Sequence, residues 1–317
     1  MTRAWRALGI LAGYLGDVVL RDPRRGHPVA GFGSAAASLE RVSYRDHRTA
    51  GAVHVAILLA AVAAAVLPVR RSTPALAAAT WACLGGTSLS RTGLAMAELL
   101  DAGDLDAARA LLPSLCGRDP ATLDGAGLAR AALESIAENT SDAAVAPLMW
   151  AAAGGAPGVC VYRAINTLDA MIGYRSPRYA RFGWAAARID DAANYLPARL
   201  TGVLTVACAA LVGGSPAGAL RAWRRDAARH PSPNAGVAES AFAGALGVRL
   251  GGPTPYAHGV EMRPELGDGP APGCGDLRRG VRLSMIVQGA AAVLAVAMSA
   301  PGWRRRARSA FQVARGL

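Results

Sequence analysis

Acidic residues recur at four-residue intervals between positions 134 and 142. Glu134, Glu138 and Asp142 would share one face of a helix, because residues four apart are neighbours on a helical surface. Like charges at this spacing destabilise a helix by roughly 0.2–0.5 kcal/mol per pair, so we expect a cation such as Mg²⁺ or arginine opposite them. A local capping arrangement around Glu138 and Asn139 is the alternative interpretation.

A second polar face follows an uncharged run, 143–162. Arg163, Asn166 and Asp169 are spaced three apart and would again line one side of a helix. Polar groups beside apolar segments are costly to bury unless they are paired. The pattern therefore predicts a polar site walled by hydrophobic helices.

Two further patterns have both a chemical and a structural interpretation. Asp190, Asp191 and Asn194 form an acidic motif that could bind a diphosphate through Mg²⁺ or form an acid-rich helix N-terminus. His27 and His230 each precede a proline, which is typical of turn residues. An imidazole at either position could also accept a proton in catalysis.

The elements that must position these groups are long uncharged segments. A segment of about 20 apolar residues is long enough to cross a bilayer. We expect a membrane hairpin from the first two segments, with a buried soluble bundle as the alternative. The third contains glycines and prolines, so it either spans in broken form along a protein cavity or forms two short surface helices. These segments are 49–69, 72–90, 143–162, 200–220 and 283–300.

The remaining segments are more polar. Residues 1–20 predict an uncleaved apolar helix ending at Asp17, followed by a loop in which Arg24 could contact an anion. Residues 91–133 have an amphipathic helical pattern, and 255–278 an exposed loop. The fold class is thus all-α: one multi-pass membrane domain, 1–317, with about four to five membrane segments and amphipathic helices between them. We expect 91–142 and 163–199 to form the membrane-proximal polar site.

Composition narrows the function classes. Of the 317 residues, 52% are hydrophobic and only 18% charged, with a net charge of +12. Few aromatics accompany that charge, which favours an anionic membrane surface over nucleic acid. All basic residues other than histidine are arginine, which excludes a P-loop lysine and Schiff-base chemistry. The five cysteines show no metal-ligand spacing, and we expect no disulfide framework.

Ordered blocks of polar and glycine residues run through nearly the whole chain. They are Asp22-Pro-Arg-Arg-x-His27-Pro-Val-x-Gly-Phe-Gly33, Glu134-Ser-Ile-Ala-Glu-Asn-Thr-Ser-Asp142, Tyr162-Arg-Ala-Ile-Asn-Thr-Leu-Asp169, Arg188-x-Asp-Asp-x-x-Asn194 and His230-Pro-Ser-Pro-Asn-x-Gly-x-x-Glu239. Together they resemble the CobD/CbiB family, the adenosylcobinamide-phosphate synthases of cobalamin biosynthesis. Ala143 stands where glycine is more usual, but it changes no charged position.

The resemblance implies a multi-pass enzyme of the cell inner membrane with its active site facing the cytoplasm. Its substrates would be a corrinoid, adenosylcobyric acid, and aminopropanol phosphate or a related phosphorylated amino alcohol. An amide would form between them with ATP as co-substrate and Mg²⁺ as cofactor. Partners would be the lipid bilayer and other cobalamin-assembly membrane proteins, and no nucleic acid.

The resemblance also suggests roles for individual residues. Catalytic groups would be His27, Glu138 and His230. Substrate and phosphate contacts would come from Arg24, Asn139, Arg163, Asn166, Asn194, Arg199 and Asn234. Metal ligands would come from Glu134, Glu138 and Asp142 together with Asp169, with Asp190 and Asp191 as a rival metal site.

Two other functions remain open at this level. The acidic motif at 190–194 also suits an intramembrane Mg²⁺-dependent prenyl-diphosphate transferase, although no second strong acidic motif accompanies it. A non-catalytic transporter or scaffold would use the acids as a coupling-ion site, but the two halves of the sequence show no repeat.

Overall fold

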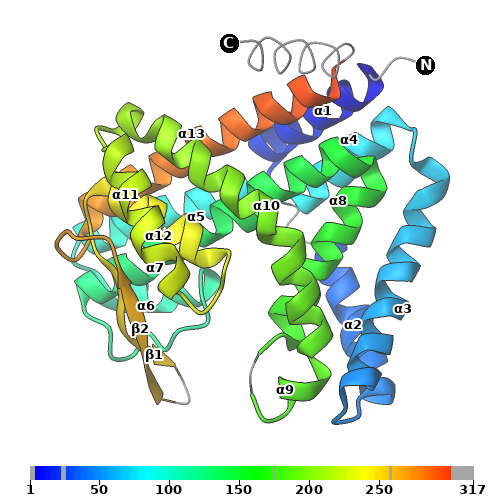
Figure 1. Cartoon of the computed structure of the whole chain (residues 1–317), viewed down its shortest axis with the longest axis horizontal. Helices are drawn as coiled ribbons and strands as arrows, with labels where there is room; N and C mark the ends of the chain where they lie inside the picture. The colour runs from blue at the N-terminus through cyan, green and yellow to red at the C-terminus, as the bar shows by residue number, and fades with distance from the viewer. Residues whose placement is uncertain (1–3, 23–25, 175, 257–258, 301–317) are drawn as a thin grey trace, which may run out of the picture. The chain divides into compact units, whose positions relative to one another are not determined.

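The structure is a computed structural model that describes residues 4–22, 26–174, 176–256 and 259–300. The described chain is helical apart from one β-hairpin (Figure 1), which confirms the all-α prediction. Four helical segments are long and apolar enough to cross a membrane, within the predicted number of four to five. They are Arg48–Val69, Gly125–Ile172, Trp184–Val212 and Cys274–Ser299.

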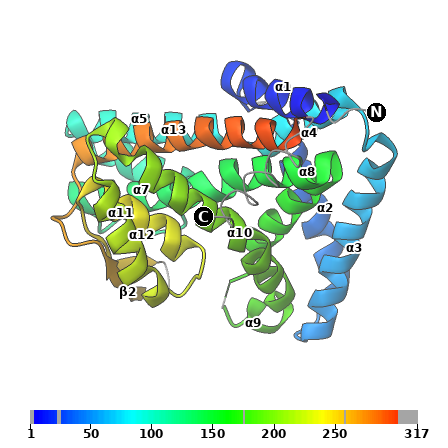
Figure 2. The ribbon, with the colours of Figure 1, turned by 45° about the horizontal axis from the view of Figure 1, so that its top comes forward.

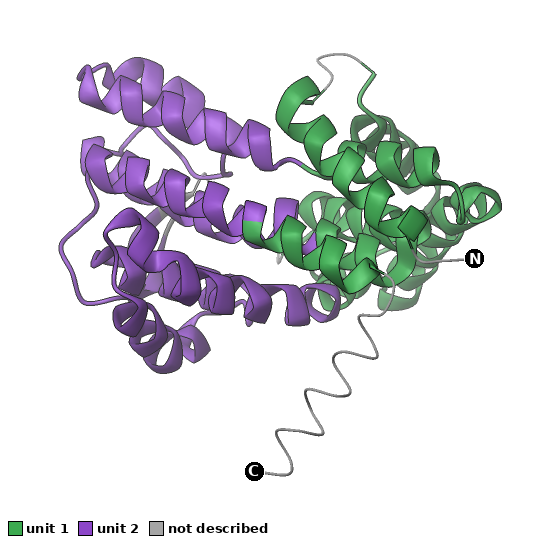
Figure 3. Ribbon diagram, turned by 90° about the horizontal axis from the view of Figure 1, so that it is seen from above, with its two compact units in different colours: residues 1–84, 147–190, 290–317 green, residues 85–146, 191–289 purple. Residues whose placement is uncertain are grey.

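The chain folds into two compact units, each assembled from separate stretches of sequence (Figure 3). Unit 1 comprises 1–84, 147–190 and 290–317, and unit 2 comprises 85–146 and 191–289. The sequence predicted one domain, 1–317, whereas the structure has two units, each with its own helical packing.

In unit 1, α1 (Ala4–Leu20) packs along α4 (Thr73–Cys83) (Figures 1 and 2). Gly9 and Gly13 lie one helical turn apart, and a Cβ at either position would press on Leu76 or Thr80. Small residues at this spacing let two helix backbones approach closely, as they do in membrane bundles. The predicted end of the first helix was Asp17, but α1 continues for three more residues, to Leu20.

The rest of unit 1 encloses an apolar core. This core includes Val55, Leu168 and Phe182, which are nearly inaccessible to solvent. Gly155 interrupts α8 with a left-handed φ of 65°, which confirms the predicted break in 143–162. The elements are α2 (Pro28–Ser43), α3 (Arg48–Val66), α8 (Ala146–Ile172), α9 (Tyr179–Phe182) and the start of α10 (Trp184–Cys208).

Unit 2 contains two groups of helices and the hairpin. In the first group, α13 lies against α5 (Figures 1 and 2), where a Cβ at Gly93 would touch Val281 and Ile136. In the second group, α11 packs on α12, which is almost entirely buried. The elements are α5 (Gly86–Asp101), α6 (Leu105–Leu111), α7 (Gly125–Thr140), α11 (Pro216–Asp226), α12 (Ala235–Leu246), β1 (Leu250–Tyr256), β2 (Gly259–Leu266) and α13 (Cys274–Ser299).

The contact between α11 and α12 depends on glycine. A Cβ on Gly244 would collide with the Gly218 carbonyl and with Ala222. We expect Gly244→Ala to lower the stability by about 1–3 kcal/mol, although alanine favours helix formation by about 1 kcal/mol. Gly275→Ala is the matched control, because a Cβ there meets nothing within 4 Å. Thermal unfolding in detergent should show a lower midpoint for the first variant only; equal midpoints would contradict the close contact.

Three predicted segment boundaries are wrong. The stretch 72–90 does not span, because α4 ends at Cys83 and α5 starts at Gly86; eleven residues of helix reach only about 16 Å. The run 200–220 crosses a left-handed turn at Gly213, so the candidate span ends at Val212. The predicted loop 255–278 instead contributes most of the antiparallel β1–β2 hairpin and the first turn of α13.

Candidate functional site

A buried ion pair in unit 2 holds one of the predicted acids. Asp124 caps the start of α7 by accepting a hydrogen bond from the Gly127 N–H at 2.7 Å. Two and a half turns later, Glu134 Oε2 contacts Arg118 Nη2, and Glu134 Oε1 accepts the Gly251 N–H at 2.6 Å. Both charged side chains are almost fully buried. Burial alone would lower the pKa of Arg118, but the Glu134 carboxylate raises it, so Arg118 keeps its charge.

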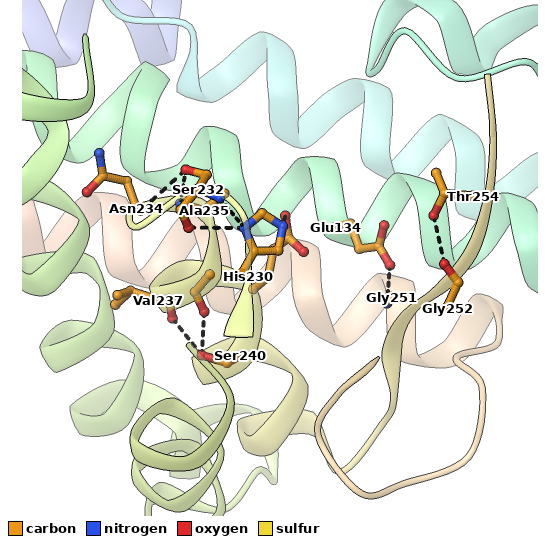
Figure 4. A network of polar contacts seen from close by, with 12 residues as sticks. Glu134, His230, Ser232, Asn234, Ala235, Val237, Ser240, Gly251, Gly252 and Thr254 are labelled. Atoms are coloured by element: carbon orange, nitrogen blue, oxygen red, sulfur yellow. Dashed lines mark hydrogen bonds and ion pairs between the residues drawn. The ribbon is translucent and has the colours of Figure 1, made fainter. Parts of the chain in front are cut away.

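A histidine and a glutamate face each other beside this pair. His230 Nδ1 lies 3.0 Å from both the backbone N–H and the carbonyl oxygen of Ser232 (Figure 4), and these contacts fix the orientation of the ring. That nitrogen lies 3.8 Å from Glu239 Oε1 on α12. In the described chain neither atom has a hydrogen-bond partner, and both side chains are at most 2% exposed. These two atoms therefore have unused hydrogen-bonding capacity within the described chain.

The electrostatics of this cluster keep Glu239 neutral. Burial raises its pKa well above the usual range, and the nearby Glu134 and Glu138 carboxylates raise it further. Burial also lowers the pKa of His230. Burial thus favours the uncharged form of both members of the pair.

Glu138 lies one helical turn after Glu134 and completes the cluster. It interacts with the charges of Arg118 and Arg263. Arg263, on β2, has a buried Nε atom without a hydrogen-bond partner among the described residues. The cluster thus combines three carboxylates with two guanidinium groups, one imidazole and unused hydrogen-bonding capacity.

Three predicted substrate contacts lie on neighbouring parts of unit 2. Asn234 donates from Nδ2 to the Asp191 carbonyl and accepts from Arg199 Nη1, both at 2.8 Å. The Arg199 guanidinium stacks 3.7 Å from the centre of the Tyr195 ring. Asn194 is also buried. Asp191 lies well inside α10, which starts at Trp184, so the helix-N-terminus interpretation of 190–194 is wrong.

The predicted metal ligands are not gathered into a metal site. Glu134 already has both oxygens engaged, and Asp142 lies in a π-helical turn, Ser141–Val145, after α7 ends. Among the described residues, no three histidine, cysteine, aspartate or glutamate side chains could together hold a metal ion. These residues do not fit a resident Mg²⁺ ion. Mg²⁺ that enters on nucleotide phosphates needs only one or two carboxylates, and its use stays a prediction.

The side-chain amide of Asn139 forms hydrogen bonds within its own helix. Its Nδ2 donates to the Ser135 carbonyl at 3.0 Å and to Ser135 Oγ at 3.2 Å. These two hydrogen bonds hold the amide nitrogen against the preceding turn of α7.

The other predicted site residues belong to unit 1. Arg163 Nη1 donates to Asn166 Oδ1 at 3.3 Å. Asp169 and Asp190 lie in α8 and α10, each with a contact of its own. His27 caps α2 by accepting the Val29 N–H at 3.2 Å, which supports its interpretation as a structural residue. Arg24 lies outside the described residues.

Three members of the cluster were not among the site residues predicted from the sequence: Arg118, Glu239 and Arg263. Glu239 is the one acid in the otherwise apolar helix 235–246, and a lone acid in a buried helix signals a function or a partner. Arg118 and Arg263 carry no such signal, because both lie among other polar residues of loop and hairpin.

Comparisons with known proteins agree with the motifs. The family model described as CobD/Cbib protein matches residues 10–284. The Cobalamin biosynthesis protein CobD of Mycobacterium tuberculosis is 66% identical over 95% of this chain and 97% of its own. The proteins of the same name from Rhodobacter capsulatus and Pelobacter propionicus are 45% and 40% identical, over 82% and 90% of this chain and 85% and 92% of theirs. No solved structure matches.

Proposed function

Because the chain belongs to the CobD/CbiB family, we propose that it acts in cobalamin biosynthesis as an amide-forming ligase. It would join a carboxylate of adenosylcobyric acid to the amine of aminopropanol phosphate or a related amino-alcohol phosphate. ATP would be the co-substrate, and Mg²⁺ would enter with it. We place the reaction at the inner membrane, on its cytoplasmic side.

The reaction needs two steps, and each step forms one bond and breaks another. The corrinoid carboxylate oxygen attacks the γ-phosphorus of ATP and releases ADP, which turns the oxygen into a leaving group. The amine then attacks the acyl carbon, and phosphate and one proton depart. Groups that attract phosphoryl oxygens, together with a proton acceptor, must therefore lie close together.

One observation supports the unit 2 cluster as this place: unused buried donors and acceptors lie beside two guanidinium groups. Arg263 would attract phosphate oxygens, and Arg118, held by Glu134, would add positive charge to the cluster. Glu138 would receive the amine end as an ammonium group and take up its proton. His230 Nε2, which has no hydrogen-bond partner among the described residues, would form a hydrogen bond with the substrate. Arg24, Arg163 and Asn166, phosphate contacts predicted from the sequence, belong to unit 1, and we give them no role in this reaction.

The decisive experiment is amide formation by purified protein in detergent. Adenosylcobyric acid, aminopropanol phosphate, Mg²⁺ and ATP would be supplied together and then omitted one at a time, with the corrinoid product identified by mass. We expect the condensed mass only when ATP and Mg²⁺ are both present. Well-folded protein that binds the corrinoid but forms no product would contradict the ligase.

Glu138→Gln should reduce product formation about 100-fold or more, because the amide keeps the shape but accepts no proton. Glu98→Gln is the matched control, since Glu98 is exposed on α5 and lies outside the cluster. Unchanged turnover in the Glu138 variant, at equal thermal stability, would remove that residue from the mechanism.

A further inference from the structure

Arg163 lies midway along the part of α8 that follows Gly155. At one end of this stretch, near Gly155, Arg6 Nη1 donates to the carbonyls of Ala152 and Ala153 at 3.0 and 3.2 Å. At the other end α8 stops at Ile172. At 1.5 Å per residue, Arg163 is about 12 Å from the first end and about 13 Å from the second.

A cavity of about 400 Å³ adjoins this arginine. Its walls come from α2, α3, α4 and α8. Arg163 is the single charged residue in a lining that is otherwise apolar except for Thr167 and two cysteines. The lining residues are Pro28, Val29, Phe32, Val62, Ala65, Val66, Ala78, Ala79, Ala82, Cys83, Cys160, Arg163, Ala164 and Thr167.

The Arg163 guanidinium makes few hydrogen bonds with the described residues. Its one hydrogen bond to a described residue goes from Nη1 to Asn166 Oδ1 at 3.3 Å, and its Nε is buried without a partner in the described chain. None of the ion pairs between described residues includes Arg163. A cation at membrane depth is costly unless it meets an anion, and such residues generally mark a functional site.

We infer that this cavity binds a single-chain amphipathic anion from the bilayer, a fatty acid, with its carboxylate on Arg163 and its hydrocarbon chain along the apolar walls. Carboxylates match the planar guanidinium fork, which can donate two parallel hydrogen bonds. A nucleotide or the amide-rich rim of a corrinoid would find almost no hydrogen-bond partner on these walls. This site is independent of the proposed ligase reaction.

The test uses full-length protein in nanodiscs of zwitterionic lipid and a nitroxide-labelled stearic acid, with the immobilised fraction read from the spectrum. We expect saturable immobilisation of the acid by the unmodified protein and at least tenfold weaker binding of its methyl ester. Arg163→Gln should bind acid and ester equally weakly, and Ala79→Leu should exclude both by filling the cavity. Arg181→Gln is the matched control, since Arg181 is an exposed arginine of unit 1 and should bind normally.

Equal affinity of the unmodified protein for acid and ester would overturn the proposal without any variant, so misfolding of a variant cannot mask the result. Displacement of the probe by adenosylcobyric acid in the unmodified protein but not in Arg163→Gln would instead assign the cavity to the corrinoid. No turnover is needed, so failure here and failure of the ligase reaction are distinguishable.

Discussion

Arg118→Met is expected to lower the free energy of unfolding by about 3–5 kcal/mol, because it leaves the buried Glu134 carboxylate without its cation. Both side chains of this pair are at most 6% exposed, so water cannot replace the lost partner. The remaining donor to that carboxylate is the Gly251 N–H. Without Arg118, the Glu134 side chain is held less firmly. Its hydrogen bond with the Gly251 N–H should then weaken, and the β1–β2 hairpin should loosen from α7.

The matched control is Arg278→Met. Arg278 pairs with Asp101 at 3.1 Å, but the two side chains are 34% and 53% exposed, so this change should cost at most about 1 kcal/mol. A double variant, Arg118→Met with Glu134→Leu, should recover much of the lost stability, because an apolar pair can replace a buried ion pair. Thermal unfolding in detergent measures all three variants. A double variant no more stable than Arg118→Met alone would show that the pair does not act through its charge.

Glu239→Gln is expected to stabilise the protein at neutral pH and to flatten the pH dependence of its stability above pH 6.5. In the folded protein, burial and two neighbouring carboxylates raise the pKa of Glu239, so the group is protonated when folded and ionised when unfolded. Above the unfolded value near 4.3, the folded state therefore binds more protons. Stability then falls as pH rises, by up to about 1.4 kcal/mol per pH unit, until the folded pKa is reached.

His230 has the opposite effect. Burial lowers its pKa, so the unfolded state binds more protons below about 6.5 and stability falls as pH falls. Between about pH 4.3 and 6.5, the effects of Glu239 and His230 on the pH dependence of stability oppose each other. Above pH 6.5, only the effect of Glu239 remains.

Thermal midpoints measured from pH 6.5 to 9 would test this prediction. As pH rises from 6.5, the unmodified protein should lose stability until the folded pKa of Glu239 is passed, and Glu239→Gln should show a flatter profile with a higher midpoint. Glu98→Gln, an exposed control, should follow the unmodified protein. Parallel profiles for both glutamate variants would mean that Glu239 is ionised in the folded state.

Several features followed from local sequence alone. Long apolar segments predicted a helical membrane protein because each must satisfy its backbone hydrogen bonds within itself. The glycines and prolines of 143–162 predicted the break found at Gly155. The 134/138 spacing placed two acids on one face of α7, and the motif blocks pointed to the family that the comparisons show.

Tertiary structure decided which of these acids meet which partners. The spacing of residues along α7 does not predict contacts with Arg118, a loop residue 16 positions earlier, or with the backbone N–H of Gly251, 117 positions later. These two contacts engage both carboxylate oxygens of Glu134, so the side chain is not available as a metal ligand. Glu239 joins Glu134 and Glu138 only because α12 packs against α7. The contribution of the sequence by itself was therefore the chemistry of each helix face, a local property, whereas charge pairing and burial depend on contacts between distant segments.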